Sequence, residues 1–133
     1  MSIRTAEVSV PSEAIDKELR AFQDAVNAGD LEALVGSYEP GAIFVVEPEK
    51  PANGVEEIRQ TWAGILTMQP TFELNGTGLY HSGDLALGTR KWTLDGKDAE
   101  GNPVHLEGHC VATYRRQQDG RWLLVLDNAC PFD

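Results

Sequence analysis

An acidic residue interrupts the last apolar run of the chain, WLLVLDNACPFD, which spans residues 122–133. Five apolar residues precede Asp127, so the pattern predicts a buried strand that carries a carboxylate. A buried carboxylate is costly unless it is paired, hydrogen-bonded or protonated. Asp127 is therefore the first candidate for acid–base chemistry. An ion pair with Arg90, or hydrogen bonds from backbone N–H groups, is the structural alternative.

Other reactive side chains fit ordinary structural roles better. Glu47 stands before a proline, where a solvated loop acid is favoured over a general base. Cys110 is expected to be a small buried hydrophobe rather than a nucleophile. His105, Glu107 and His109 alternate on one strand face at a spacing that could chelate a metal. We expect no metal site there, because this face is predicted to meet another subunit.

Composition limits the classes of partner. The chain has 133 residues, of which 41% are hydrophobic and 24% charged, as is typical of one globular domain. A net charge of −10 argues against nucleic acid and anionic membrane partners, since both select for basic patches. The sequence contains neither a membrane-spanning apolar stretch nor a signal-peptide core, so we expect a cytoplasmic protein. Cys110 and Cys130 form no C-x-x-C pair, and neither a zinc site nor a cofactor is expected.

The elements that must position these residues begin with helices. Residues 1–11 are expected to form an arm and residues 12–133 a single domain. Ser12 is expected to cap the first helix, and Asp30 a short helix over residues 31–38. A strand is expected over 41–46, and a third helix from Asn53 or Gly54 to Pro70. Strands at 71–80, 84–94, 104–116 and 121–128 follow, so we predict an α+β domain with three N-terminal helices packed on a curved, mostly antiparallel sheet.

Alternation along the last two strands assigns side chains to faces. A hairpin turn at QQDG predicts one face with Cys110, Ala112, Tyr114 and Asp127, and another with Val111, Trp122, Leu124 and Leu126. Both faces are apolar enough to need cover. Helices can cover one, and a second copy of the chain is the simplest cover for the other. The pattern therefore predicts a homodimer through the face that carries Trp122 and Leu124.

The order of elements resembles the NTF2-like superfamily, and most of all its SnoaL-like and ketosteroid-isomerase-like branch. The likeness spans residues 12–133 and is carried by NAGDLEALVGSYEPGAIFVVEP, GVEEIRQTW, GDLALGTRKWTLDGKDAEGNPV, GHCVATYRRQQDGRW and LDNACPF. It implies a conical α+β barrel with one pocket, and a homodimer through the convex sheet face. This scaffold hosts isomerases, cyclases, hydrolases and non-enzymes, so fold alone does not name a reaction.

The resemblance also implies site residues. Alignment by eye assigns to the pocket Phe22, Tyr38, Trp62, Gly88, Arg90, Trp92, Cys110, Ala112, Tyr114 and Asp127. Ketosteroid isomerases use a tyrosine and a protonated aspartic acid as oxyanion hole, with a separate carboxylate base. Here Phe22 and Ala112 stand at the two donor positions, which argues against a steroid isomerase, while Glu47 matches the base after one extra residue. SnoaL-type cyclases carry an acid–base aspartate on the late strands, a role open to Asp127.

The function expected from the sequence is a small-molecule pocket protein with an apolar, aromatic or polycyclic ligand. As an enzyme it would be a cofactor-free isomerase or cyclase that transfers a proton next to a carbonyl. Asp127 would be the base or acid, with Arg90 and Tyr38 as polarising or orienting groups. The aromatic residues Tyr38, Trp62, Trp92 and Tyr114 are equally compatible with a cavity lining and with ordinary core packing. The alternatives are a non-catalytic ligand-binding or dimerisation module and a protein scaffold.

Overall fold

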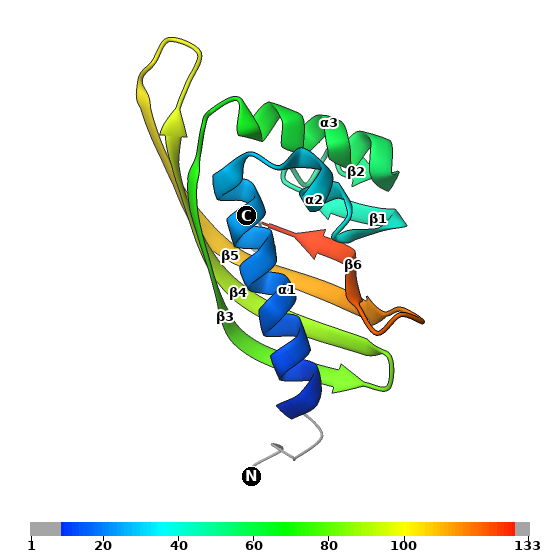
Figure 1. The fold of residues 1–133 in the computed structure, drawn as a ribbon. Coiled ribbons are helices and arrows are strands. Elements are labelled where there is room, and N and C mark those ends of the chain that lie inside the picture. Colours follow the sequence, from blue (N-terminus) through cyan, green and yellow to red (C-terminus); the bar gives the residue numbers. More distant parts are fainter. Residues whose placement is uncertain (1–8, 130–133) are drawn as a thin grey trace.

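One curved sheet and the helices packed on it make up the protein. The computed structural model describes residues 9–129 (Figure 1). The elements in chain order are α1 (Ser9–Ala28), α2 (Leu31–Val35), β1 (Tyr38–Val45), β2 (Ala52–Asn53), α3 (Gly54–Leu66), β3 (Thr71–Ser82), β4 (Leu85–Lys97), β5 (Pro103–Arg116) and β6 (Trp122–Asn128).

The strands lie in the order β2-β1-β6-β5-β4-β3, and β1 runs parallel to β6 while the other pairs are antiparallel. The sheet curves around α1, and α3 lies across the end that carries β1 and β2 (Figure 1). The α+β class is confirmed, since the helices pack on one curved, mostly antiparallel sheet. The sheet stays open at β2 and β3, so it does not close into the barrel that was expected.

The first helix begins earlier than its sequence pattern suggests. The predicted cap at Ser12 is wrong, because α1 begins at Ser9. Pro11 lies in the first turn, where a missing N–H leaves no helical hydrogen bond unmade. Residues 1–8, most of the expected arm, lie outside the described residues. Among the helices described, none is long and apolar enough to cross a membrane.

The segment between the first two helices and β1 differs from the expectation in one respect. The backbone N–H of Ala33 donates to Asp30 Oδ1 at 3.1 Å, which confirms the predicted cap of α2. Gly29 adopts a left-handed conformation with φ of 69° and ends α1, as expected. However, α2 ends at Val35, and Tyr38 begins β1 instead of closing the helix. Tyr38 therefore lies on a strand that pairs with β6.

A β-bulge between β5 and β6 reverses part of the predicted face assignment. Thr113 pairs with Leu126, but Tyr114 pairs with Leu124, so β6 contains one extra residue. Side chains before the bulge therefore turn to the opposite face. Trp122 and Leu124 are 5% and 1% exposed in the core, and the prediction that they form an outer face is wrong. Leu126, beyond the bulge, is 47% exposed and stays outside.

Side-chain amides fasten α1 to the edge strand β3. Asn27 accepts from the Phe72 N–H at 2.7 Å and donates to the Phe72 carbonyl at 3.0 Å. Gln23 accepts from the Leu74 N–H at 2.8 Å. Backbone groups at an open sheet edge can pair with another chain, and these contacts occupy three of them. The helix is thereby held across the concave face, where it forms one wall of the site.

Candidate functional site

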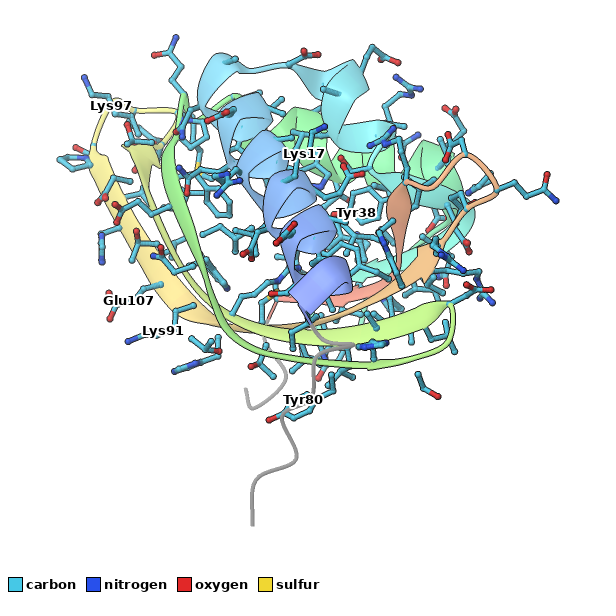
Figure 2. All side chains as sticks on the ribbon, turned by 60° about the horizontal axis from the view of Figure 1, so that its bottom comes forward. Lys17, Tyr38, Tyr80, Lys91, Lys97 and Glu107 are labelled. Atoms are coloured by element: carbon cyan, nitrogen blue, oxygen red, sulfur yellow. The ribbon has the colours of Figure 1, made fainter. Side chains whose placement is uncertain are left out.

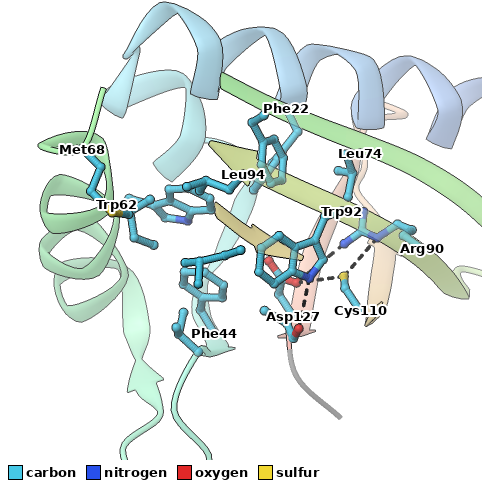
Figure 3. A pocket seen from close by; sticks show the side chains of 15 residues that line it. Phe22, Phe44, Trp62, Met68, Leu74, Arg90, Trp92, Leu94, Cys110 and Asp127 are labelled. Carbon is cyan, nitrogen blue, oxygen red and sulfur yellow. Dashed lines mark hydrogen bonds and ion pairs between the residues drawn. The ribbon is translucent and has the colours of Figure 1, made fainter. Parts of the chain in front are cut away.

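A cavity of about 200 Å³ lies between the concave face of the sheet and helices α1 and α3 (Figure 3). Its rim includes Val46 and Leu106, which are 41% and 45% exposed, so the cavity opens to solvent beside them. The lining is apolar apart from one charged pair and a thiol. It comprises Phe22, Phe44, Val46, Trp62, Ile65, Met68, Phe72, Leu74, Arg90, Trp92, Leu94, Leu106, Cys110, Asp127 and Ala129.

One wall is a cluster of aromatic rings from three elements. Phe44 on β1 stacks on Trp62 of α3, with centroids 5.2 Å apart and planes 7° from parallel. Phe22 of α1 meets the same indole edge-on, at 5.4 Å and 74°. Offset-stacked and edge-on arrangements are those that aromatic quadrupoles favour. The three rings therefore form a closely packed aromatic wall.

The cavity lining contains a second indole, that of Trp92 on β4 (Figure 3). Its Nε1 donates to the carbonyl of Ala129 at 3.1 Å. It lies against Gly108 on β5, where an added Cβ would come within 3.2 Å of Trp92 Cζ2. Glycine at this position therefore gives the ring room to lie on the sheet, and the hydrogen bond fixes its orientation.

The floor of the cavity carries Arg90 from β4 and Asp127 from β6, which are only 3% and 5% exposed. Arg90 Nη2 and Asp127 Oδ1 are 3.6 Å apart. Cys110, on the strand between them, links the two. Arg90 Nε donates to Cys110 Sγ at 3.3 Å, and the thiol lies 3.7 Å from Asp127 Oδ1 (Figure 3). The charges of the pair compensate each other in a place where an isolated charge would be costly.

Tyrosines behind the floor hold both members of the charged pair. Tyr38 donates to Asp127 Oδ2 at 2.7 Å and accepts from Trp62 Nε1 at 3.1 Å. Burial and the nearby Asp127 raise the pKa of Tyr38 well above its usual value, so its hydroxyl remains a donor. Arg90 Nη1 donates to the hydroxyl of Tyr114, whose pKa burial raises to about 12. These contacts fix the directions of the carboxylate and the guanidinium.

The thiol of Cys110, on the floor of the cavity, is expected to be unreactive. Burial raises the pKa of Cys110 to about 12, Asp127 adds to the rise, and Arg90 opposes it. The thiolate is the nucleophilic form, and the raised pKa keeps Cys110 as the thiol at neutral pH. Cys110 therefore serves as a hydrogen-bonding link between Arg90 and Asp127. Burial alone would lower the pKa of Arg90, but Tyr114, Cys110 and Asp127 outweigh burial and raise it. Arg90 is thus a permanent cation.

The structure brings six of the sequence-predicted site residues to the cavity lining: Phe22, Trp62, Arg90, Trp92, Cys110 and Asp127. Five others lie elsewhere. Four of them, Tyr38, Gly88, Ala112 and Tyr114, are buried behind the lining. Tyr38 contacts Asp127 where direct contact with a ligand was expected. Glu47 is exposed in the loop after β1, and Val46 lines the rim in its place.

Sequence reasoning missed several lining residues that the alternation of strands predicts. Phe72 and Leu74 alternate inward on β3, and Leu94 continues the inward series of Arg90 and Trp92 on β4. The residue spacing was therefore sufficient to find them. Phe44 follows the same rule with Ala42 on β1, once the strand is known to begin at Tyr38.

The residues weighed as metal ligands lie outside the cavity. His105 contacts Asp95 at 2.6 Å and Glu107 at 3.0 Å, and all three are exposed. The two carboxylates raise the pKa of His105 through these hydrogen bonds. Across residues 9–129, the structure contains no group of three or more His, Cys, Asp or Glu side chains arranged to hold a metal ion.

Comparisons with known proteins agree on the fold. Similar solved structures include a nuclear transport factor 2 (NTF2-like) superfamily protein from Salmonella enterica, with 15% identity, a TM-score of 0.79, and coverage of 91% of this chain and 90% of that one. An NTF2-like protein with a cystatin-like fold from Novosphingobium aromaticivorans has 19% identity, a TM-score of 0.77, and coverage of 96% and 85%. A ketosteroid isomerase-like protein from Erwinia carotovora has 15% identity, a TM-score of 0.77, and coverage of 87% and 92%.

At such identities the likeness concerns the fold alone. No curated protein sequence matches the chain. Residues 19–125, however, match the family model of the SnoaL-like domain. The matched segment includes both tyrosines of the floor, the aromatic wall and the Arg90–Cys110 contact, and it ends just before Asp127. The match covers most of the chain, and the protein therefore belongs to the SnoaL-like domain family.

Proposed function

We propose that the protein binds a compact, largely apolar small molecule in the cavity between the sheet, α1 and α3. The observation that carries this proposal is an aromatic cavity with one charge-compensated pair at its floor. Ligand sites in proteins commonly combine an apolar lining with a few convergent polar groups. Membership of the SnoaL-like family is consistent with such a site.

The volume of the cavity limits the size of the ligand. A cavity of about 150 Å³ is known to hold benzene, whereas drug-sized molecules occupy about 300 Å³ or more. The cavity of about 200 Å³ therefore suits one or two fused rings inside, with any larger part of the molecule at the open rim. A planar ring system would lie along the stacked pair formed by Phe44 and Trp62.

Binding of naphthalene, followed by tryptophan fluorescence, tests the proposal. Leu74→Trp should fill part of the cavity and abolish binding, because Leu74 is a buried lining residue. Leu85→Trp is the matched control, since Leu85 is 43% exposed and lies outside the lining. Circular dichroism would confirm that both variants fold. Failure of the wild type to bind, or equal binding by the Leu74 variant, would contradict the proposal.

A second candidate function is proton transfer next to a carbonyl of the ligand. It is favoured by the 3.6 Å separation of Arg90 Nη2 and Asp127 Oδ1. Asp127 would take a proton from the carbon beside the carbonyl, the C–H electron pair would form the enolate double bond, and the carbonyl π pair would move onto the oxygen, which Arg90 would hold. In a ligand with a second carbon–carbon double bond conjugated with the enolate, return of the proton to the far carbon of that bond would complete an isomerisation. Tyr38 would be a positioning residue, because it acts through Asp127.

Hydrogen–deuterium exchange of 2-tetralone, a bicyclic ketone, separates this candidate from a non-catalytic binding module. In heavy water, an acid–base catalyst should accelerate exchange at the carbon beside the carbonyl, as followed by NMR. Asp127→Asn should remove the acceleration while 2-tetralone still binds. A wild type that binds the ketone and leaves its exchange rate at the buffer level is a binding module.

We also propose a homodimer through the convex face of the sheet. A row of paired residues, Tyr80, Leu87, Thr113 and Leu126, crosses strands β3 to β6 there. Tyr80, Leu87 and Leu126 are 53%, 40% and 47% exposed, and Tyr80 projects from the convex side (Figure 2). Contiguous exposed apolar side chains favour association. The face proposed thus differs from the one expected from sequence, which included Trp122 and Leu124.

A further inference from the structure

We infer that the ligand carries one neutral polar group that both donates and accepts a hydrogen bond, such as a phenolic hydroxyl. This group would bridge Asp127 Oδ1 and Arg90 Nη2 at the floor of the cavity. The inference rests on the proposed binding function and adds the polar chemistry of the ligand. It follows from the hydrogen-bonding capacity that each floor residue has left.

Arg90 has one nitrogen left for a ligand. Its Nε donates to Cys110 and its Nη1 to Tyr114. Its Nη2 lies 3.6 Å from Asp127 Oδ1, which is longer than a direct N–H···O hydrogen bond. Within residues 9–129, the hydrogen bonds found for this guanidinium run from Nε and Nη1. Nη2 is therefore the donor that a group in the cavity can use.

Asp127 has one oxygen left in the same way. Oδ2 accepts a strong hydrogen bond from Tyr38 at 2.7 Å. Among the described residues, the hydrogen bond found to Oδ1 comes from the weak thiol donor of Cys110, with sulfur 3.7 Å away. A carboxylate oxygen has two lone pairs and can accept more than this. Oδ1 is therefore the acceptor that remains for a ligand donor.

The spacing of these two atoms matches a single hydroxyl. Hydrogen bonds between a hydroxyl and charged partners are about 2.6–2.9 Å long. An oxygen at that distance from both Nη2 and Oδ1 forms a triangle whose third side is the observed 3.6 Å. It would accept from Arg90 and donate to Asp127 at once. An ether could use only Arg90 Nη2, and a hydrocarbon would form a hydrogen bond with neither Nη2 nor Asp127 Oδ1.

The charges at the floor of the cavity favour a ligand whose polar group is electrically neutral. The floor already contains one cation and one anion, each nearly fully buried. A ligand carboxylate would add a second negative charge beside Asp127, in a cavity whose other lining residues are apolar. Arg90 is engaged by Tyr114, Cys110 and Asp127. These charges favour neutral hydroxyl compounds over acidic ligands.

Four probes of nearly equal size test the inference on the full chain at neutral pH: naphthalene, 2-methoxynaphthalene, 2-naphthol and 2-naphthoate. We expect 2-naphthol to bind about tenfold or more tightly than naphthalene, since two charge-assisted hydrogen bonds form. The methoxy compound should gain less, and the carboxylate should bind most weakly. Isothermal calorimetry measures all four dissociation constants.

The outcomes separate the inference from the function on which it rests. Equal binding of naphthalene and 2-naphthol, or tighter binding of 2-naphthoate, would overturn the inference and leave the binding function intact. Binding of none of the four would overturn the binding function itself. These comparisons need no variant, so they hold even if a substitution at the floor prevents folding.

A substitution at Asp127 tests whether the preference for 2-naphthol arises at the floor of the cavity. Asp127→Asn should remove most of the tenfold preference for 2-naphthol while the dissociation constant of naphthalene changes little. Lys91→Met is the matched control, because it removes a charge from the next position after Arg90, on the opposite, exposed face of β4 (Figure 2). A folded Asp127→Asn protein that keeps the full preference would show that the hydroxyl binds elsewhere and would overturn the inference.

Discussion

The Tyr38 hydroxyl donates a 2.7 Å hydrogen bond to Asp127 Oδ2, across 89 positions of sequence. The parallel pairing of β1 with β6 brings the two residues together, and Trp62 of α3 donates to the same hydroxyl at 3.1 Å. Two elements from the first half of the chain thus hold a carboxylate of the last strand in a fixed orientation. The apolar run of β6 can therefore carry an aspartate because a buried donor is already aimed at it.

Tyr38→Phe should destabilise the protein by about 1–3 kcal/mol, because it leaves Asp127 Oδ2 without its strongest donor in a buried place. Equilibrium unfolding in urea measures the change. Tyr80→Phe is the matched control, as Tyr80 is 53% exposed, and it should change the free energy of unfolding by less than about 0.5 kcal/mol. Equal effects of the two substitutions would mean that the Tyr38 hydroxyl contributes nothing to stability.

Substitutions at two leucines of β6 should have opposite consequences. Leu126→Asp, on the convex face, should leave the fold intact and convert the proposed dimer into a monomer. Leu124→Asp places an unpaired charge at a fully buried position and should prevent stable folding. Light scattering gives the mass and circular dichroism the fold. A wild type that is monomeric at micromolar concentration would refute the dimer.

Stability should fall as the pH rises above 9. Folding raises the pKa of Cys110 from 9.0 to about 12, and that of Tyr114 from 10.0 to about 12, mainly through burial. The folded state therefore holds these protons more tightly than the unfolded state. Their stabilising effect is complete below pH 9 and is lost as the pH rises toward 12. Guanidinium unfolding midpoints at increasing pH measure the loss.

A matched variant tests the cause of that alkaline loss. Tyr114→Phe cannot ionise at this position, so its midpoint should decline less steeply between pH 10 and 12 than that of the wild type. It also removes the acceptor of Arg90 Nη1, so it should be less stable at neutral pH. An unchanged alkaline slope would assign the loss to other groups.

Asn27→Ala should weaken the attachment of α1 to β3 and uncover part of the sheet edge. It leaves both backbone groups of Phe72 without their side-chain partner, and the expected cost is about 1–3 kcal/mol. Asp24→Ala is the control, an exposed residue less than one turn away on the same helix. Urea unfolding measures stability, and light scattering after heating measures self-association. Identical behaviour of the two variants would refute an edge-covering role for Asn27.

Sequence patterning predicted the α+β class, the helix cap at Asp30 and the inward position of Asp127, because each depends on local chemistry or on alternation within one strand. It failed where the local signal was ambiguous. Residues 122–126 are apolar at every position, so no polar residue marks the change of face at the bulge. Tyr38 follows a short helix and precedes Glu39 and Pro40, a context that suits a helix end as well as a strand start.

The site was predictable to a similar degree. Six lining residues could be named from the family resemblance, and strand alternation agreed with it for Cys110 and Asp127. The Arg90–Asp127 ion pair was among the structural alternatives expected from the sequence. The contacts of this pair with Cys110 and Tyr114 were not, because they depend on the packing of three separate strands. Glu47 is exposed in the loop after β1, as the favoured interpretation of a solvated loop acid predicted, and its family match to a catalytic base does not bring it to the cavity lining.

The bulge in β6 also determines which side chains of this strand point to the inside of the protein. Leu124 and Asp127 are separated by an odd number of positions, so in a regular strand they would point to opposite faces. The extra residue lets both point inward, one as packing and the other as the polar floor of the cavity. If the same sequence paired without the bulge, regular alternation would force a choice between a complete hydrophobic core and an inward-facing acid. A single backbone insertion thus allows a seven-residue strand to serve two different environments.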